Sequence, residues 1–348
     1  MAANEDNNGD ADRGYVLSIA ENAIAPENIK KRCCFACGGP PSTGQGEHVI
    51  PKWLQRKFSL HDERLGLLNQ TLIPYRHLTV PCCTPCNTGF LSEIERKVQS
   101  IVDRGEIGSD DEQLAIARWM AKILIGILVL ETALLLDRKN PSLGSIVPVD
   151  WIQELHHCHL ILQSARKPTI FNCLHSPFPF SAYWYKIEYQ ENEFPFDLST
   201  NIIGQSIAMR LGCLGIVLIN DGGLQMEVGP KGPFDLLGST VSETQFSELY
   251  ARIHYKSSLR DATHFYINSE SPTSIIINQE TVRPYTSTLL PGGEIKIFRP
   301  WDETTFSYIA SRATGADRSI FFDPATGKRG TFLGNLLGED MVERSDAN

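Results

Sequence analysis

Apolar residues recur at helical spacing just after a cysteine-rich segment. Within GFLSEIERKVQSIV they fall three or four positions apart, which predicts an amphipathic helix. The recurring positions are Phe90, Ile94, Val98 and Ile101. Ser92 followed by Glu95 has the spacing of a capping box and predicts the start of this helix. The chain immediately before it, including Cys86 and Asn87, is then expected in the turn that opens the helix.

A second helix is predicted from Ser109, which Glu112 follows three residues later, through a long apolar run. The pattern ends at DRKNP, where charges and Pro141 stop it. The most apolar part, residues 122–137, is interrupted by Lys122 and Glu131. A membrane span needs about 20 nearly uncharged residues, so this stretch predicts a buried helix and excludes a membrane partner.

From about residue 148 the pattern changes to short apolar runs separated by Gly, Pro, Asn and Asp, which predict strands. The runs are HCHLILQ, SAYWYKIEY, GCLGIVLI, GGLQMEV, ATHFYINS, TSIIINQ and GGEIKIF. The Asn-Asp-Gly-Gly sequence predicts a hairpin between residues 213–219 and 224–228. Further helices are expected over residues 243–255 and 302–313. The fold class is therefore α+β, with a mixed and mostly antiparallel C-terminal part.

Composition bounds these predictions. The chain has 348 residues, of which 42% are hydrophobic, enough for two or three domains with sizeable cores. Residues 1–26 are polar and acidic, which predicts a disordered tail, and they lack the basic and apolar regions of a secretory signal. A cytoplasmic location is expected. The net charge is −9, yet residues 27–104 hold 11 Lys and Arg against 7 Asp and Glu, so the cysteine-rich segment is the basic one.

Nine cysteines without an export signal argue against a disulfide framework. Two Cys-x-x-Cys pairs stand out instead: Cys34 with Cys37, and Cys83 with Cys86. Four thiolates with this spacing are the ligands of a tetrahedral structural Zn²⁺. Cys33 and Cys82 would give three-residue gaps and are treated as bystanders.

The segment between the two pairs contains GEHVIPKWL, and Asn87 follows the last cysteine directly. Over about residues 32–125 the chain resembles the zinc-stabilised HNH endonucleases, which are the His-Me finger or ββα-metal nucleases. These place Asp-His or Glu-His, an apolar residue and Pro between two Cys-x-x-Cys pairs, then close with Cys-Asn or Cys-His at a helix. The glycine-rich stretch that usually follows the Pro is replaced by KWLQRKF.

The resemblance implies catalytic roles. His48 would be the general base that activates water, and Glu47 with Asn87 would bind one catalytic Mg²⁺ or Mn²⁺. Neighbours on a regular strand point to opposite faces, so a loop or bulge is expected at Glu47–His48. The middle position of the motif falls on His77, with Asn69 as the other candidate.

The predicted organisation is an acidic tail (1–26), a zinc-containing HNH nuclease domain (27–104), a helical connector (105–145) and an α+β domain for a partner or ligand (146–340). The expected function is metal-dependent hydrolysis of phosphodiester bonds in DNA, or else RNA, gated and serving in defence against phage or foreign DNA. Lys52, Arg56 and Lys57 are the candidate nucleic-acid contacts. A second copy or a regulatory protein is the expected partner of the C-terminal domain. The alternative is an inactive zinc scaffold that docks on nucleic acid or protein.

Overall fold

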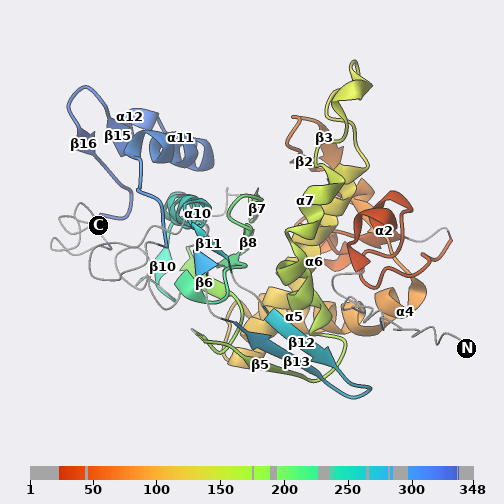
Figure 1. Ribbon diagram of the computed structural model, residues 1–348. Coiled ribbons are helices and arrows are strands. Elements are labelled where there is room, and N and C mark those ends of the chain that lie inside the picture. The colour runs from red at the N-terminus through yellow and green to blue at the C-terminus, as the bar shows by residue number, and fades with distance from the viewer. Residues whose placement is uncertain are drawn as a thin grey trace, which may run out of the picture.

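The computed structural model of the protein describes residues 23–43, 46–174, 176–188, 194–225, 236, 238–263, 266–280, 283–284, 297–334 and 336. These residues form a mixed α+β structure, which confirms the predicted fold class at that level (Figure 1). The predicted acidic tail lies outside the described residues as far as residue 22. Ala23, Ile24 and Ala25 are buried, so packed chain begins ahead of the boundary expected at residue 26.

Short helices and two strand pairs make up the first part of the chain. They are α2 (Pro26–Lys30), β1 (Gly46–His48), α3 (Lys52–Lys57), β2 (Arg64–Gly66), β3 (Leu72–Pro74), η1 (Tyr75–His77), β4 (Thr79–Pro81), α4 (Thr84–Cys86), η2 (Asn87–Leu91) and α5 (Ser92–Arg104). β1 pairs with β4 and β2 pairs with β3, both antiparallel. The chain between β1 and β4 therefore holds α3, a small hairpin and η1.

Helix α5 confirms the predicted amphipathic helix, since Ile94, Val98 and Ile101 are buried on one side. The predicted capping box at its start is wrong. Leu91 is the residue that precedes the helix, its backbone is already helical, and no side chain caps the end. The chain enters α5 directly from η2, and the Glu95 carboxylate is bound instead by Lys122.

The most apolar stretch forms α6 (Asp110–Thr132), which lies between the N-terminal elements and the rest of the molecule in Figure 1. Its start is as predicted, because the Ser109 side chain accepts a hydrogen bond from the Glu112 backbone N–H. By length and composition α6 is the one helix among the described residues that can cross a bilayer, but 83% of its apolar window is buried. It is a core helix of a globular protein.

Helix α6 ends five residues before the predicted end at Asp137. Leu135 pairs with Ser145 in an isolated antiparallel bridge, and the Ile146 N–H donates to the Leu134 carbonyl. These backbone bonds turn the chain out of the helix. The next elements are η3 (Pro141–Leu143), α7 (Val149–Gln153) and α8 (His156–Gln163).

The strand predicted at HCHLILQ is wrong, because this segment is the helix α8. Both sides of the helix are covered by protein. Cys158, Ile161 and Leu162 belong to the large core around α6, whereas Leu160 packs on a separate small sheet. An apolar run that is buried on two sides lacks the one-sided period of a surface helix, so its pattern alone does not separate helix from strand.

A five-stranded sheet follows, with the order β10-β6-β9-β8-β7. Its strands are β6 (Ser181–Ile187), β7 (Phe196–Asn201), β8 (Ser206–Leu211), β9 (Leu214–Ile219) and β10 (Thr240–Val241). All pairs are antiparallel except β10 with β6. Along β9, Ile216 and Leu218 face the core around α6, and Val217 and Ile219 face the helix α10 (Glu243–Ser258). Burial of both faces explains why the strand sequence is continuously apolar.

The hairpin predicted across Asn-Asp-Gly-Gly is not formed in the described residues. β9 pairs with β6 and β8, and the chain at Leu224 and Gln225 is helical. Asp221 explains the local turn, because its carboxylate accepts hydrogen bonds from the backbone N–H groups of Gly223 and Gln225. The remainder of that predicted strand, and most of GGEIKIF, lies outside the described residues.

Smaller elements complete the fold. In a three-stranded sheet of order β12-β13-β5, β5 pairs with β13 in parallel and β12 pairs with β13 antiparallel. Helix α11 packs on α10, at the opposite end of the molecule from α2 and α4 (Figure 1). The elements are β5 (Thr169–Asn172), β11 (Ala262–Thr263), β12 (Tyr266–Glu270), β13 (Ile275–Gln279), β14 (Arg283–Pro284), α11 (Glu303–Thr314), α12 (Arg318–Phe321), β15 (Phe322–Asp323) and β16 (Lys328–Arg329). Helices α10 and α11 confirm the two predicted C-terminal helices.

Candidate metal centre and adjoining site

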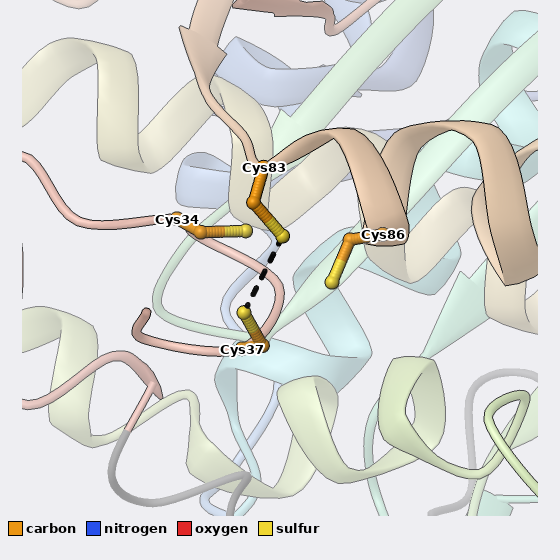
Figure 2. A group of neighbouring side chains, drawn as sticks. All are labelled: Cys34, Cys37, Cys83 and Cys86. Atoms are coloured by element: carbon orange, nitrogen blue, oxygen red, sulfur yellow. Dashed lines mark hydrogen bonds between the residues drawn. The ribbon is translucent and has the colours of Figure 1, made fainter. Parts of the chain in front are cut away.

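Four cysteines from two segments gather around one point. Cys34 and Cys37 lie in the turn after α2, Cys83 directly precedes α4 and Cys86 ends it, and the four sulfur atoms are turned toward one another (Figure 2). All four sulfur atoms lie within 4.8 Å of one another. The sulfur atoms of Cys37 and Cys83 are 3.7 Å apart. Zinc–thiolate bonds of about 2.3 Å give a tetrahedron with edges of about 3.8 Å, so the predicted ligand set can hold a metal ion and fits structural zinc.

The bystander cysteines differ from each other. Cys82 is buried, and its sulfur lies 3.9 Å from that of Cys34. The neighbouring thiols of Cys82 and Cys86 lower the pKa of the Cys34 thiol far below its ordinary value. Cys33 is partly exposed and is not one of the four clustered cysteines.

Side chains of helix α8 contact the backbone between Cys34 and Cys37. The His159 Nε2 lies 2.8 Å from the Phe35 carbonyl oxygen, and the Gln163 side-chain amide donates to the Ala36 carbonyl. Phe35 and Ala36 are the two residues between Cys34 and Cys37. The helix that sequence patterning mistook for a strand therefore holds the backbone of the candidate metal turn.

Glu47 and His48 lie on β1 and point to opposite sides of it. Glu47 is buried, whereas His48 is half-buried. The predicted bulge is absent, because Gly46, Glu47 and His48 pair one to one with residues of β4. An unbroken register keeps the two-residue alternation of a regular strand, so the two side chains do not converge.

The inner side of β1 carries a buried charged group, here called the lysine cluster: Lys122, Glu47 and Glu95. The Lys122 ammonium, on α6, forms ion pairs with both carboxylates. It also lies 3.3 Å from the His48 carbonyl oxygen. Lys122 is only 1% exposed. Burial alone would lower the pKa of Lys122, but the Glu95 and Glu47 carboxylates raise it above its ordinary value, so the ammonium stays charged.

His48 lies on the outer side of β1, where solvent reaches it. Partial burial lowers the pKa of His48, and the positive charges of Lys52 and Lys122 lower it further, while Glu95 opposes them. An imidazole with a lowered pKa is neutral near pH 7 and can accept a proton. His48 therefore has the protonation state and access that a general base requires.

The other predicted catalytic residues occupy different settings. Asn87 is half-buried in the first turn after α4, directly beyond Cys86. His77 is exposed at the end of η1, one residue before Leu78, whose carbonyl accepts from the Val49 N–H.

Asn69 has a structural explanation. Its side-chain oxygen accepts from the Thr71 N–H in the β2–β3 turn, and its amide nitrogen donates to the carbonyls of Leu135 and Leu136. These contacts occupy both ends of the Asn69 side chain and tie the hairpin to the chain after α6. Of the two candidates for the middle motif position, His77 is the one whose side chain is exposed to solvent.

The candidate nucleic-acid contacts all lie on α3, which begins four residues after His48. Lys52 and Arg56, one helical turn apart, are exposed. Lys57 is engaged differently: its ammonium lies 2.6 Å from an Asp103 carboxylate oxygen on α5. Of these three cations, Lys52 is the one whose charge acts on His48.

Sequence reasoning missed the part that Lys122 takes in this site and assigned Glu95 to a helix cap. One signal was present: a lysine in the middle of an apolar helix requires a partner when the helix is buried. The identity of that partner was not readable, because Lys122 lies 75 residues from Glu47 in the chain.

Comparison of the chain with known protein families, with curated proteins and with solved structures gave no match.

Proposed function

We propose that the protein is a metal-dependent endonuclease of the HNH type, in which a zinc-bound cysteine scaffold presents a hydrolytic site. The observation that carries the proposal is the conjunction of three features within one short segment. A four-cysteine cluster lies beside an antiparallel strand pair, a solvent-accessible His48 ends the first strand, and Asn87 opens the helix after the last cysteine. This order of strand, strand and helix supports the resemblance on which the proposal rests.

In the proposed reaction His48 removes a proton from the attacking water. Its neutral imidazole faces the outer side of β1, and the exposed Lys52 and Arg56 side chains on α3 offer positive charge to a phosphate backbone. Asn87 and Glu47 are the oxygen donors offered to a divalent ion. When bound, Mg²⁺ or Mn²⁺ would stabilise negative charge on the scissile phosphate.

The donor set fits such an ion in part. Asn87 is half-buried and its side chain is of the right type. Glu47 is buried, and its Oε1 accepts a hydrogen bond from the Lys122 ammonium, so this carboxylate is already engaged by protein. The regular strand means that Glu47 and His48 act on opposite sides of β1 and not on the same ion.

The rival function is a docking module without catalysis, built on the same zinc scaffold. The observation that favours it is the engagement of Glu47 by Lys122, because a buried ion-paired carboxylate is also a purely structural arrangement. The two functions differ in one outcome: a docking module binds nucleic acid and leaves it intact.

The test is plasmid cleavage by the purified full-length protein with Mg²⁺ or Mn²⁺, beside an EDTA control. Nicking or linearisation that requires the divalent ion supports the endonuclease. Binding to the plasmid at low salt, without cleavage under either metal, supports the docking module. RNA of matched length, tested in parallel, decides between DNA and RNA as the substrate.

A further inference from the structure

A fifth cysteine adjoins the four-cysteine cluster without belonging to it. The sulfur of Cys82 lies 3.9 Å from that of Cys34, and both side chains are buried. Cys82 is not one of the four cysteines whose sulfur atoms gather within 4.8 Å of one another. The cluster therefore has a close sulfur neighbour that a four-coordinate metal ion does not use.

Backbone hydrogen bonds join the chain segments that carry Cys34 and Cys82. The Phe35 N–H donates to the Pro81 carbonyl at 3.0 Å, and the Ser42 N–H donates to the Cys82 carbonyl at 3.1 Å. These bonds hold the segment that begins at Cys34 alongside the end of β4, where Cys82 follows. Since a disulfide bond is about 2.05 Å long, the two sulfurs need to approach by only about 2 Å to form one.

The pair of Cys34 and Cys82 differs from the other close pair in what it takes from a metal ion. Cys37 and Cys83, with sulfur atoms 3.7 Å apart, are both candidate ligands. A disulfide between them would withdraw two ligands at once, whereas a disulfide between Cys34 and Cys82 withdraws only Cys34. Because a structural zinc ion takes four ligands, the loss of one already weakens its binding.

We propose that Cys82 is an oxidation site that makes the metal centre responsive to peroxides. Oxidation joins Cys34 to Cys82 in a disulfide, and the centre, left with three thiolates, releases its zinc. The inference concerns the scaffold alone. It goes beyond the proposed function, does not rest on nuclease activity and applies equally to a docking module.

The oxidant is a hydroperoxide, which takes two electrons from the pair of sulfurs. One thiolate attacks a peroxide oxygen, the O–O bond breaks, and hydrogen peroxide yields a sulfenic acid and hydroxide. The second thiol then attacks the sulfenic sulfur, so that the S–S bond forms and the S–O bond breaks. The thiol proton leaves with the hydroxyl group as water. Cys37 and Cys83 are partly exposed, so solvent reaches the cluster on their side.

The experiment treats zinc-loaded, full-length wild type with increasing concentrations of hydrogen peroxide. Zinc release is followed with a chromogenic chelator, and the remaining thiols are alkylated in denaturant before digestion with trypsin. Trypsin places Cys34 in peptide 33–52 and Cys82 in peptide 77–96. A disulfide between them joins the two peptides, whereas a disulfide within either Cys-x-x-Cys pair leaves the peptides separate. Mass spectrometry distinguishes the two results, and fragmentation assigns the bonded cysteines.

Cys82→Ser is the test variant, and Cys33→Ser is the matched control. Cys33 precedes Cys34 in the chain, is partly exposed and is likewise outside the four-cysteine cluster. Both variants are expected to bind about one zinc ion per chain before oxidation. In the wild type and in Cys33→Ser, peroxide should yield the joined peptide together with zinc release, and reductant with added zinc should restore the metal. Cys82→Ser should yield no joined peptide and keep its zinc at peroxide concentrations that empty the wild type.

The proposal is overturned by wild-type peptides that stay separate, by zinc loss from Cys82→Ser at the wild-type peroxide concentration, or by a joined peptide that persists in Cys82→Ser. The peptide map of the wild type needs no variant, so it decides the proposal even if Cys82→Ser does not fold. A wild type that cleaves no plasmid would refute the proposed function and leave the peptide map unaffected.

Discussion

Two buried polar groups lie on opposite sides of the large sheet, and they differ in charge and access. The lysine cluster holds three charged groups beneath a strand whose other side exposes His48. The second group, here called the histidine cluster, consists of Ser206, His254 and Ser257. The Ser206 hydroxyl lies 2.7 Å from His254 Nδ1 and 3.1 Å from the Ser257 hydroxyl.

By residue type alone, the histidine cluster resembles a catalytic pair more closely than the lysine cluster does. A serine that is hydrogen-bonded to a histidine can serve as a nucleophile. Ser206 is completely buried, however, and His254 is 5% exposed. Burial lowers the pKa of His254 to about 4, so the ring is neutral in the folded protein. Access and charge, more than residue identity, distinguish a candidate site from a polar group that fastens a helix to a sheet.

Loss of the metal is expected to have the largest effect. It should destabilise the elements around the lysine cluster and leave those around the histidine cluster unchanged. Cys86→Ser removes one of four zinc ligands, and structural zinc in small metal domains contributes about 10–16 kcal/mol of apparent binding free energy. We expect zinc content to fall from about one ion per chain towards none. Hydrogen exchange should then accelerate in β1, β4 and α5 and stay slow in α10 and β8.

The control for this variant is Cys33→Ser, since Cys33 lies outside the four-cysteine group. It should keep its zinc and its exchange pattern. Uniform acceleration through α10 and β8 in Cys86→Ser would contradict the separation, because it would mean that both regions depend on the metal equally.

Acid is expected to act next most strongly, and through the histidine cluster. The pKa of His254 in the folded protein, about 4, lies below its ordinary 6.5, so the unfolded chain takes up the proton first. The stability it contributes is full above pH 6.5 and is lost as pH falls towards 4. The loss amounts to about 3 kcal/mol, at 1.36 kcal/mol for each pKa unit.

Urea unfolding of the wild type and of His254→Asn between pH 7.5 and 4.5 measures this contribution. Asn supplies an acceptor near the position of Nδ1 and does not titrate in this range. Its unfolding free energy should fall less steeply with acid than that of the wild type. Parallel curves for the two proteins would show that His254 is not the group that titrates.

The smallest of these effects is expected at the support of the metal turn. His159→Ala removes the ring that contacts the Phe35 carbonyl, and loss of outer-shell support commonly lowers metal affinity by about 10- to 100-fold. His156→Ala, on the same helix, is the control, because the His156 ring contacts the Gln153 carbonyl and not the metal turn. Zinc competition with a chromogenic chelator measures both. Equal zinc affinities in the two variants would show that His159 on α8 does not support metal binding at the cysteines.

Local signals in the sequence predicted the features that depend on neighbouring residues. The two-residue cysteine gaps located the four-cysteine cluster, and Ser109 with Glu112 located the start of α6. Both rest on chemistry within one turn of chain. The alternation of Glu47 and His48 across β1 also followed from strand geometry, although a bulge was expected to remove it.

Features that depend on residues distant in the chain could not be predicted from the sequence pattern. Glu95 has the spacing of a capping residue, but a buried ammonium from α6 binds its carboxylate. The α8 segment was predicted as a strand because core contacts on both of its sides conceal the helical period. In both cases tertiary contacts decide the outcome against the local pattern.

The most direct test of the account is single-turnover plasmid cleavage in Mn²⁺ by zinc-loaded His48→Ala beside His61→Ala. His61 is a matched control, since its side chain is 69% exposed on the loop after α3 and takes no part in the site. We expect His48→Ala to slow cleavage by about 10²- to 10⁴-fold, as loss of a general base does, and His61→Ala to cleave like the wild type. Cleavage by His48→Ala at the wild-type rate would contradict this role, because the activity would then not depend on His48.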